Sequence, residues 1–300
     1  MAITTNCLMF DNQQLIYDGT GILYSADPLN PLNLPPFTIR LLYKDNVTPI
    51  FLKGTGVQIS SSPNIWDLTY NNANWDSILY KHEGLLEVHG ANTTGVTNMF
   101  SMFNRCKSLR LVNLFDTSAV TTMESMFELC SALTSVPLFN TSAVTDMDNM
   151  FAMCYILPAV PLFDTSNVTT MIGTFYACNE LVTIPQFNTS KVSVMRNTFE
   201  ACSSLKTIAL LDTSNVVDMR YLCMYCGSLT AIPLFNTSKV VYMRYAFLDC
   251  FNVESGALAL YTQASSQATP PEQHEEVFKD CGINTVTGAA ELAQIPADWK

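Results

Sequence analysis

Charge is scarce in this 300-residue chain, and positive charge is scarcest. Only 14% of the residues are charged, and 15 Lys and Arg stand against 26 Asp and Glu, for a net charge of −11. Because proteins that wrap nucleic acid neutralise its phosphates with clustered Lys and Arg, this balance excludes a nucleic-acid partner. No apolar run approaches the roughly 18 residues that span a bilayer, so we expect no membrane insertion.

Recognisable catalytic and targeting signals are also missing. The N-terminal residues lack the basic start and apolar centre of a signal peptide, which predicts export by another route or a removed leader. The three histidines, His82, His89 and His274, lie near no nucleophile motif. The single C-x-x-C pair, Cys223 and Cys226, lacks the second pair of a zinc site. We therefore predict no enzyme, no metal and no cofactor. A catalytic site at a flank joint, using His82 or His89, is the least favoured alternative.

What the chain does have is a strict 24-residue period, marked by cysteine. Seven cysteines keep this spacing: Cys106, Cys130, Cys154, Cys178, Cys202, Cys226 and Cys250. A methionine lies seven residues before each of them, and a phenylalanine lies three residues before six of them. A fixed period of this length indicates stacked coils whose cores close against their neighbours. Because a residue that recurs once per coil occupies an inward position, we predict free, buried thiols.

One coil divides into three parts. Residues 133–138 read L-x-x-V-x-L, the spacing of a short buried strand, which places Leu138 inward. Residues 140–142 are Asn-Thr-Ser, a polar turn. Residues 147–154 carry Met, Met, Phe and Cys at the spacing of one face of a short helix. Prolines that remove ladder donors predict very short strands, and they recur at Pro137, Pro161, Pro185 and Pro233.

Residues 92–253 carry a longer signature, F-[DN]-T-S-x-V-T-x-M-x-x-M-F-x-x-C-x-x-L. In this signature the chain resembles the BspA-type leucine-rich repeat family. The resemblance implies a curved leucine-rich repeat solenoid and a surface or adhesion-like protein of bacteria or their mobile elements. Together with the period, it predicts an α/β repeat solenoid of seven 24-residue coils, each a short parallel strand, a turn and a short helix.

We predict that each flank caps one end of the solenoid, because the terminal coils would otherwise expose their cores. We assign 1–91 to an N-terminal arm and β-rich capping domain, 92–254 to the solenoid, and 255–300 to a C-terminal cap. Within the first flank, runs at 38–43, 50–52 and 57–60 are strand-like, and 75–80 resembles a short helix. A proline-rich linker from Asp27 sets residues 1–26 apart. The C-terminal flank repeats the F-x-x-C step at 278–281, and its last residues, with Trp299, are expected to close the core.

One column breaks the repeat pattern, at the position after each repeat methionine. We call this the edge column, and it consists of Phe100, Glu124, Asp148, Ile172, Arg196, Arg220 and Arg244. In two coils, Thr121 with Glu124 and Thr145 with Asp148 resemble capping boxes that start the short helices. Later in the chain arginine takes the acid's place, where it would oppose a helix dipole. Local rules that fail together indicate a functional site.

We therefore predict a ligand-binding patch, the arginine–tyrosine edge. It comprises Arg196, Arg220, Arg244, Tyr221, Tyr242 and Tyr245. The alternative is an ordinary solvated ridge in which Asp218 and other acids relieve the stacked arginines.

The predicted function is non-enzymatic recognition or adhesion, with a protein or a surface glycan as the ligand. Two placements compete: a bacterial surface protein, or a component of a phage particle or its tail, docked into a larger assembly through the N-terminal region. A structural virion component with no ligand of its own is the alternative.

Overall fold

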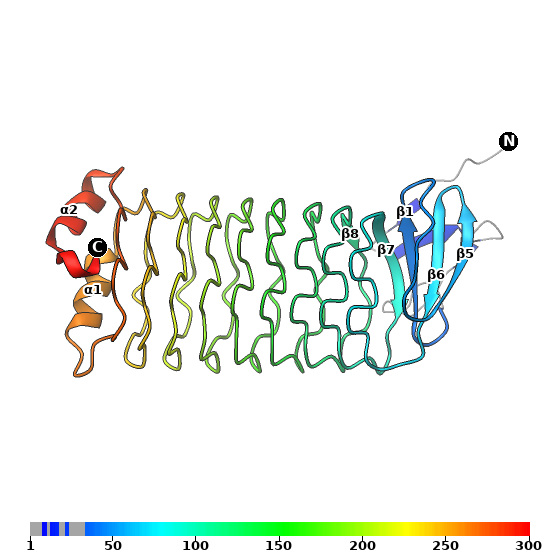
Figure 1. Cartoon of the computed structure of the whole chain (residues 1–300), viewed down its shortest axis with the longest axis horizontal. Helices are drawn as coiled ribbons and strands as arrows, with labels where there is room; N and C mark the ends of the chain where they lie inside the picture. The colour runs from blue at the N-terminus through cyan, green and yellow to red at the C-terminus, as the bar shows by residue number, and fades with distance from the viewer. Residues whose placement is uncertain (1–7, 11–12, 18–21, 24–33) are drawn as a thin grey trace.

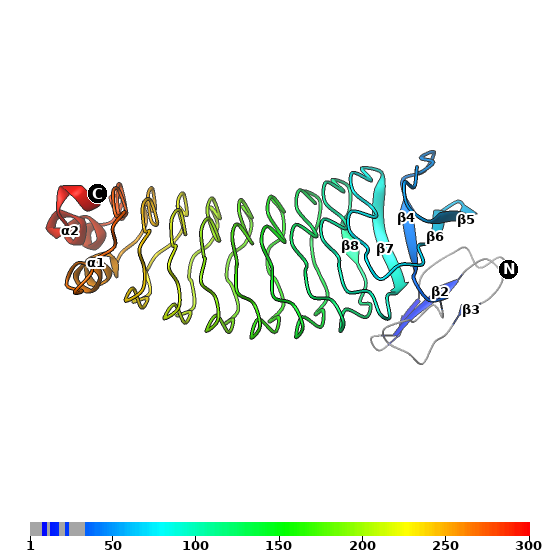
Figure 2. The same ribbon diagram turned by 60° about the horizontal axis from the view of Figure 1, so that its bottom comes forward.

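The computed structural model describes residues 8–10, 13–17, 22–23 and 34–300. A single, slightly curved row of coils runs between a β-sheet near the N-terminus and helices at the C-terminus (Figures 1 and 2). Residues 1–26, predicted as an arm, contribute three short strands, β1 (Leu8–Phe10), β2 (Gln13–Tyr17) and β3 (Ile22–Leu23), paired as an antiparallel sheet. Most of the predicted linker lies outside the described residues.

A five-stranded sheet begins the ordered core. Its order is β5 (Thr55–Ser61), β6 (Asn64–Thr69), β4 (Thr38–Tyr43), β7 (Leu85–Asn92) and β8 (Leu111–Val112). The strand-like runs at 38–43 and 57–60 fall in β4 and β5. The prediction of a strand at 50–52 is wrong: this apolar run forms a loop in which Ile50 and Leu52 are exposed.

The sheet leads directly into the solenoid. β7 pairs antiparallel with β4 but parallel with β8, where Val88 lies opposite Val112, one 24-residue period later. On the other side of the coil, the Trp75 amide already bonds to the Asn98 carbonyl of the next coil. Residues 75–80 are therefore turns of a first, degenerate coil, and the prediction of a short helix there is wrong.

Columns of identical side chains fill the core. The Phe151 ring stacks on Phe127 at 5.7 Å and on Phe175 at 5.8 Å, with planes within 5°. Each repeat thiol donates to a carbonyl of the preceding coil, as Cys154 Sγ does to Phe127 O at 3.2 Å. The nine described cysteines are all free and buried, which confirms the predicted inward thiols within that part of the chain.

The short helices predicted in each coil are wrong. Residues such as Ser125 and Leu129 have φ of 54° and 60°, and this left-handed conformation interrupts any helix. Alternate amides bond instead to the next coil: Ser125 N donates to Asp148 O at 2.8 Å, while Met126 N closes a turn on Met123 O. A ladder of linked turns therefore replaces the helix, and it satisfies the backbone donors coil by coil.

The opposite side of each coil has little sheet. Beyond β8, its strand pairing in the described chain is limited to isolated bridges such as Thr183 with Thr207, so the expectation of very short strands is confirmed. Leu138, predicted inward, is 59% exposed. The Phe139 amide folds back onto the Pro137 carbonyl at 2.9 Å, a tight turn that sends Phe139 inward and Leu138 outward.

The C-terminus covers the last coil with three short helices. α1 (Ala257–Ser265) precedes the final F-x-x-C step in the sequence and lies beside α2 (Val286–Gln294) at the end of the row, and η1 (Ala297–Trp299) ends the chain (Figure 1). The Trp299 ring lies 6.4 Å from Phe278, which itself stacks on Phe247 at 6.0 Å. Trp299 is only 4% exposed, so the expected closure of the core by the last residues is confirmed.

Candidate functional site

The edge column lies along the turn ladder, where every coil presents one side chain at the same place. Five of the six residues of the arginine–tyrosine edge make ring or hydrogen-bond contacts with their neighbours on the ladder. Arg220 forms a two-pronged ion pair with Asp218, Nε to Oδ1 at 3.0 Å and Nη2 to Oδ2 at 2.6 Å. Its guanidinium also lies 4.9 Å from the Tyr242 ring centroid. Arg220 is thus held by an acid and an aromatic ring.

Arg244 is the exposed cation of the edge. Its guanidinium lies 4.5 Å from the Tyr245 ring centroid, and Nη2 donates to the Tyr245 hydroxyl at 2.7 Å. The Tyr245 ring packs on Tyr221 at 5.4 Å. Both tyrosines line a shallow groove of about 440 Å³, whose far wall includes Lys279 and Asp280. The arrangement offers a cation, two aromatic faces and a hollow beside them.

Arg196 is separate from the other five residues. Its side chain makes no hydrogen bond, ion pair or ring contact within the described residues. The positive charge of Arg196 lowers the pKa of Asp148, which lies two coils earlier in the same column. Burial acts the other way and is stronger, so the pKa of Asp148 is raised.

The prediction that these arginines oppose a helix dipole is wrong, because the ladder of turns contains no helix. The amide of the column residue is instead capped by the residue two positions earlier: Thr122 Oγ1 accepts from Glu124 N at 3.3 Å, and Asp218 Oδ1 accepts from Arg220 N at 3.0 Å. Thr121, predicted as a cap, donates to Thr97 O of the preceding coil. Asp218 does pair with Arg220, as the alternative of an ordinary solvated ridge expected.

Glu124 and Asp148, the acids of the edge column, form no ion pair among the described residues. Burial and the nearby charges of Asp146, Asp148 and Glu128 raise the pKa of Glu124, whose carboxylate makes no hydrogen bond among the described residues. Asp148 Oδ1 accepts from Thr170 Oγ1 and from Ile172 N, both at 2.7 Å. Acids therefore gather at one end of the column and arginines at the other.

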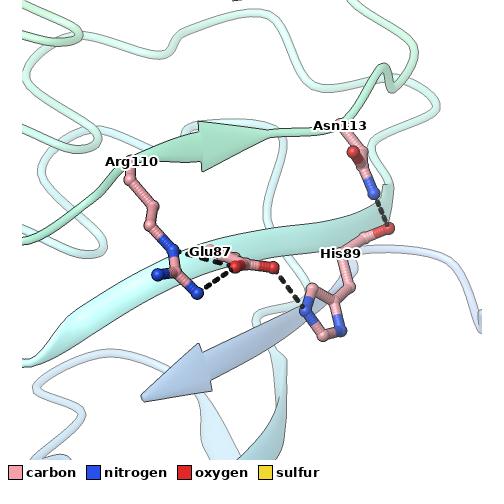
Figure 3. Close-up of polar contacts among 4 residues, drawn as sticks. All are labelled: Glu87, His89, Arg110 and Asn113. Carbon is pink, nitrogen blue, oxygen red and sulfur yellow. Dashed lines mark hydrogen bonds and ion pairs between the residues drawn. The ribbon is translucent and has the colours of Figure 1, made fainter. Parts of the chain in front are cut away.

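His89 belongs to a polar cluster at the joint between the sheet and the solenoid (Figure 3). Glu87 on β7 accepts from Arg110 Nε and Nη2, at 3.0 and 2.6 Å, and bonds to His89 Nε2 at 3.1 Å. Asn113 Nδ2 donates to the His89 carbonyl at 2.9 Å. The contacts drawn in Figure 3 involve no hydroxyl or thiol, and they clamp β7 to the next coil.

This cluster makes a testable contribution to stability at low pH. The hydrogen bonds from His89 and Arg110 lower the pKa of Glu87 to about 2. A carboxyl whose pKa is lower in the folded state stabilises the fold above its unfolded pKa, and this stabilisation is lost as pH falls through the folded pKa. We expect Glu87→Gln to cost about 1–2 kcal/mol at pH 7, after allowance for solvent screening.

The difference between Glu87→Gln and the wild type should shrink between pH 4.5 and 2, and urea unfolding at several pH values would measure it. Glu83→Gln is the matched control, because Glu83 is exposed and its ion pair with Lys107 is also exposed. An equal cost for both variants at pH 7 would contradict the role of the clamp.

The other two histidines cap the ends of the core. His82 occupies the cysteine position of the first coil, where its Nδ1 bonds to the Tyr43 hydroxyl at 2.6 Å and its ring stacks on Phe51. Burial lowers the pKa of His82 to about 4, so the ring is neutral at pH 7. His274 stacks on Trp299 at 4.4 Å and bonds through Nδ1 to Pro271 O at 2.8 Å.

One surface feature has no counterpart in the sequence-based prediction. Four outward leucines recur at the same position of their coils, each more than half exposed: Leu138, Leu162, Leu210 and Leu234. The missed signal is the proline before three of them, Pro137, Pro161 and Pro233, because the turn there reverses the alternation of the strand. This leucine row lies on the strand side of each coil, apart from the edge column on the turn ladder.

The stacked coils form a repeat solenoid of the leucine-rich repeat class. Its core is covered at both ends, and the edge column runs along one side. No group of three or more His, Cys, Asp or Glu among the described residues is placed to hold a metal ion. None of the helices in that part of the chain has the length and apolar character needed to cross a membrane.

Two overlapping segments, residues 76–179 and 153–260, match the family described as "Mycoplasma protein of unknown function, DUF285". Together they cover more than half of the chain, which therefore belongs to this family. The assignment supports the broader resemblance to BspA-type leucine-rich repeat proteins. No curated protein matches the chain.

Two solved structures are similar in part. The leucine-rich repeat protein of T. pallidum is 16% identical, with a TM-score of 0.33, over 45% of this chain and 62% of its own. A leucine-rich repeat protein from Eubacterium ventriosum is also 16% identical, with a TM-score of 0.38, over 55% and 52%. The chain thus spans less than two thirds of either protein.

Proposed function

We propose that this chain is a non-enzymatic recognition or adhesion protein that binds a carboxylate-bearing protein or surface glycan through its arginine–tyrosine edge. The observation that carries the proposal is the exposed Arg244 guanidinium held against Tyr245, beside the Tyr221 ring and the groove. A guanidinium pairs with carboxylates in a fixed geometry. Aromatic rings supply rigid contact area for a sugar face or a side chain.

A ligand of this edge has to bind through a few specific contacts and not through its overall charge. Asp218 already pairs with Arg220, and acids such as Asp249, Glu276 and Asp280 border the tyrosines and the groove. The net charge of −11 repels polyanions in general. A partner must therefore place single carboxylates opposite the arginines, so the proposal favours a shaped ligand over a uniformly charged polymer.

The experiment is binding of the wild type and two variants to an array of neutral and carboxylated oligosaccharides and acidic peptides. Arg244→Glu should weaken binding to carboxylated members at least tenfold, because a charge-assisted contact becomes repulsive. Lys206→Glu is the control: it makes the same change of charge at an exposed residue on the strand side of a coil. Equal binding by Arg244→Glu and Lys206→Glu, or no binding by the wild type, would contradict the proposal.

We also propose display on a phage particle or a bacterial surface. The thiol column is compatible with an oxidising medium, because burial raises the pKa of thiols such as Cys106 and Cys178, and thiolate is the form that reacts with oxidants. Labelling of intact cells and of purified particles with an antibody against the solenoid would locate the chain.

A further inference from the structure

We infer that the edge column binds a second, antiparallel copy of this chain, related by a two-fold axis at Ile172. The inference rests on the proposed function, since it names a partner that supplies carboxylates to Arg196 and Arg220 of the same edge. The evidence is that the column is complementary to itself when its order is reversed about its central residue.

The reversal pairs each acid with an arginine. A two-fold axis that lies between two copies and crosses the column at Ile172 makes each copy run opposite to the other. A residue a given number of coils before Ile172 then faces the residue the same number of coils after it. Glu124 faces Arg220 and Asp148 faces Arg196. At the outer end Phe100 faces Arg244, a cation over an aromatic ring, and at the axis Ile172 faces itself.

The neighbouring column is complementary in size. Its residues are two positions after each repeat methionine, and reversed pairing sets Ser101 opposite Tyr245 and Ser125 opposite Tyr221. Both serines are buried beneath the surface, whereas both tyrosines project from the other end of the column. At the axis Gly173, which is buried under the Asn149 side chain of its own copy, faces its own equivalent. Small residues therefore oppose large ones in the two outer pairs of this second column, while Asn149 faces Asn197, a residue of equal size.

Each copy leaves the required groups available. Six members of the edge column are half-buried, and Arg244 is exposed. The Glu124 carboxylate, Asp148 Oδ2 and Arg220 Nη1 make no hydrogen bond within the described part of the chain. Burial, and after it the charges of Asp146, Asp148 and Glu128, raise the pKa of Glu124 within one copy. A reversed second copy supplies the missing cations at both ends of the contact.

The repeat keeps the two copies in register over the whole contact. Both present side chains at the same rung spacing of about 5 Å, so six steps give a contact about 30 Å long. A contact of this length, with the columns on either side, lies at the low end of stable interfaces. We therefore expect a dissociation constant on the order of micromolar, increasing with salt because the paired charges are screened.

The test uses Ile172, which meets its own copy only if the axis lies there. At a protein concentration about 100 times the dissociation constant, sedimentation velocity of the full wild-type chain should show a dimer. Ile172→Arg and Ile172→Glu each place like charges at the axis and should weaken association at least a hundredfold. Mixed in equal amounts, the two variants should form a mixed dimer, because Arg then faces Glu.

The matched controls are Leu162→Arg and Leu162→Glu, which introduce the same charges on the leucine row. These variants should dimerise like the wild type. Glu124→Arg, far from the axis, should weaken association as Ile172→Arg does, and melting curves would confirm that each variant is folded. Failure of the mixed Ile172 variants to associate, or loss of association in the Leu162 pair, would overturn the inference. A monomeric wild type whose array binding is lost in Arg244→Glu would overturn it and leave the proposed function standing.

Discussion

Phe151→Asp should lower the free energy of unfolding by about 5 kcal/mol or more and unfold much of the solenoid. Phe151 is 1% exposed, and it stacks on the phenylalanines of both neighbouring coils. Truncating a buried phenylalanine costs about 3–5 kcal/mol, and an unpaired buried carboxylate adds to this. Because each coil is stabilised only by its neighbours, the loss breaks the array into two shorter stacks. Urea unfolding followed by circular dichroism measures the effect.

The matched control is Leu138→Asp, thirteen residues earlier in the chain. Leu138 is 59% exposed, so its replacement by Asp introduces the same charge into water and should change stability by less than about 0.5 kcal/mol. Losses of similar size in the two variants would contradict the assignment of inward and outward positions.

Alkaline unfolding is the second large effect that we expect. Burial raises the pKa of Cys106, Cys178 and Cys281 to about 12, and it also raises the pKa of four further thiols, those of Cys130, Cys154, Cys202 and Cys250. Unfolded thiols lose their protons near pH 8.5, so above that pH the unfolded chain binds fewer protons than the folded one. Stability is therefore full below about pH 9 and falls as pH rises toward 12.

The expected size of this fall is decisive. A shift of about three pKa units corresponds to about 4 kcal/mol for each thiol at high pH, and a domain is typically stable by only about 5–15 kcal/mol. The fold should therefore be lost before pH 12.

Labelling with a thiol reagent counts the buried thiols at pH 7.5. The folded Cys7→Ser variant should bind almost no reagent, and the same variant in denaturant should bind nine equivalents, as measured by the mass of the intact chain. Prompt labelling of several thiols in the folded state would contradict the buried column.

The columns of the core could be predicted from sequence because a repeat places the same residue in the same surroundings many times. Cys154, Phe151 and Met147 lie inward as their recurrence indicates. However, side chains spaced three and four residues apart share one face both in a helix and in a ladder of turns closed by hydrogen bonds from residue i+3 to residue i. The deciding contact, from Ser125 N to Asp148 O, joins two coils and leaves no trace in the sequence of one.

The candidate site could be predicted in position but not in its electrostatics. Recurrence alone brings Tyr221 and Tyr245 together, since they are one period apart. The ion pair of Arg220 with Asp218 depends on the ladder conformation, in which residues two positions apart point the same way. A helix would have separated them. Replacing Arg220 would therefore leave Asp218, which is 7% exposed, without its partner.

The central claim is that recognition takes place on the arginine–tyrosine edge. Arginine-specific labelling with phenylglyoxal, read residue by residue by mass spectrometry, tests it most directly. The wild-type chain would be labelled alone and with the array member that it binds most tightly. We expect Arg244 and Arg196 to be protected at least fivefold, while Arg110, which pairs with Glu87 at the far end of the solenoid, reacts unchanged. Protection of Arg110 as strong as that of Arg244, or no protection of Arg244, would contradict the claim.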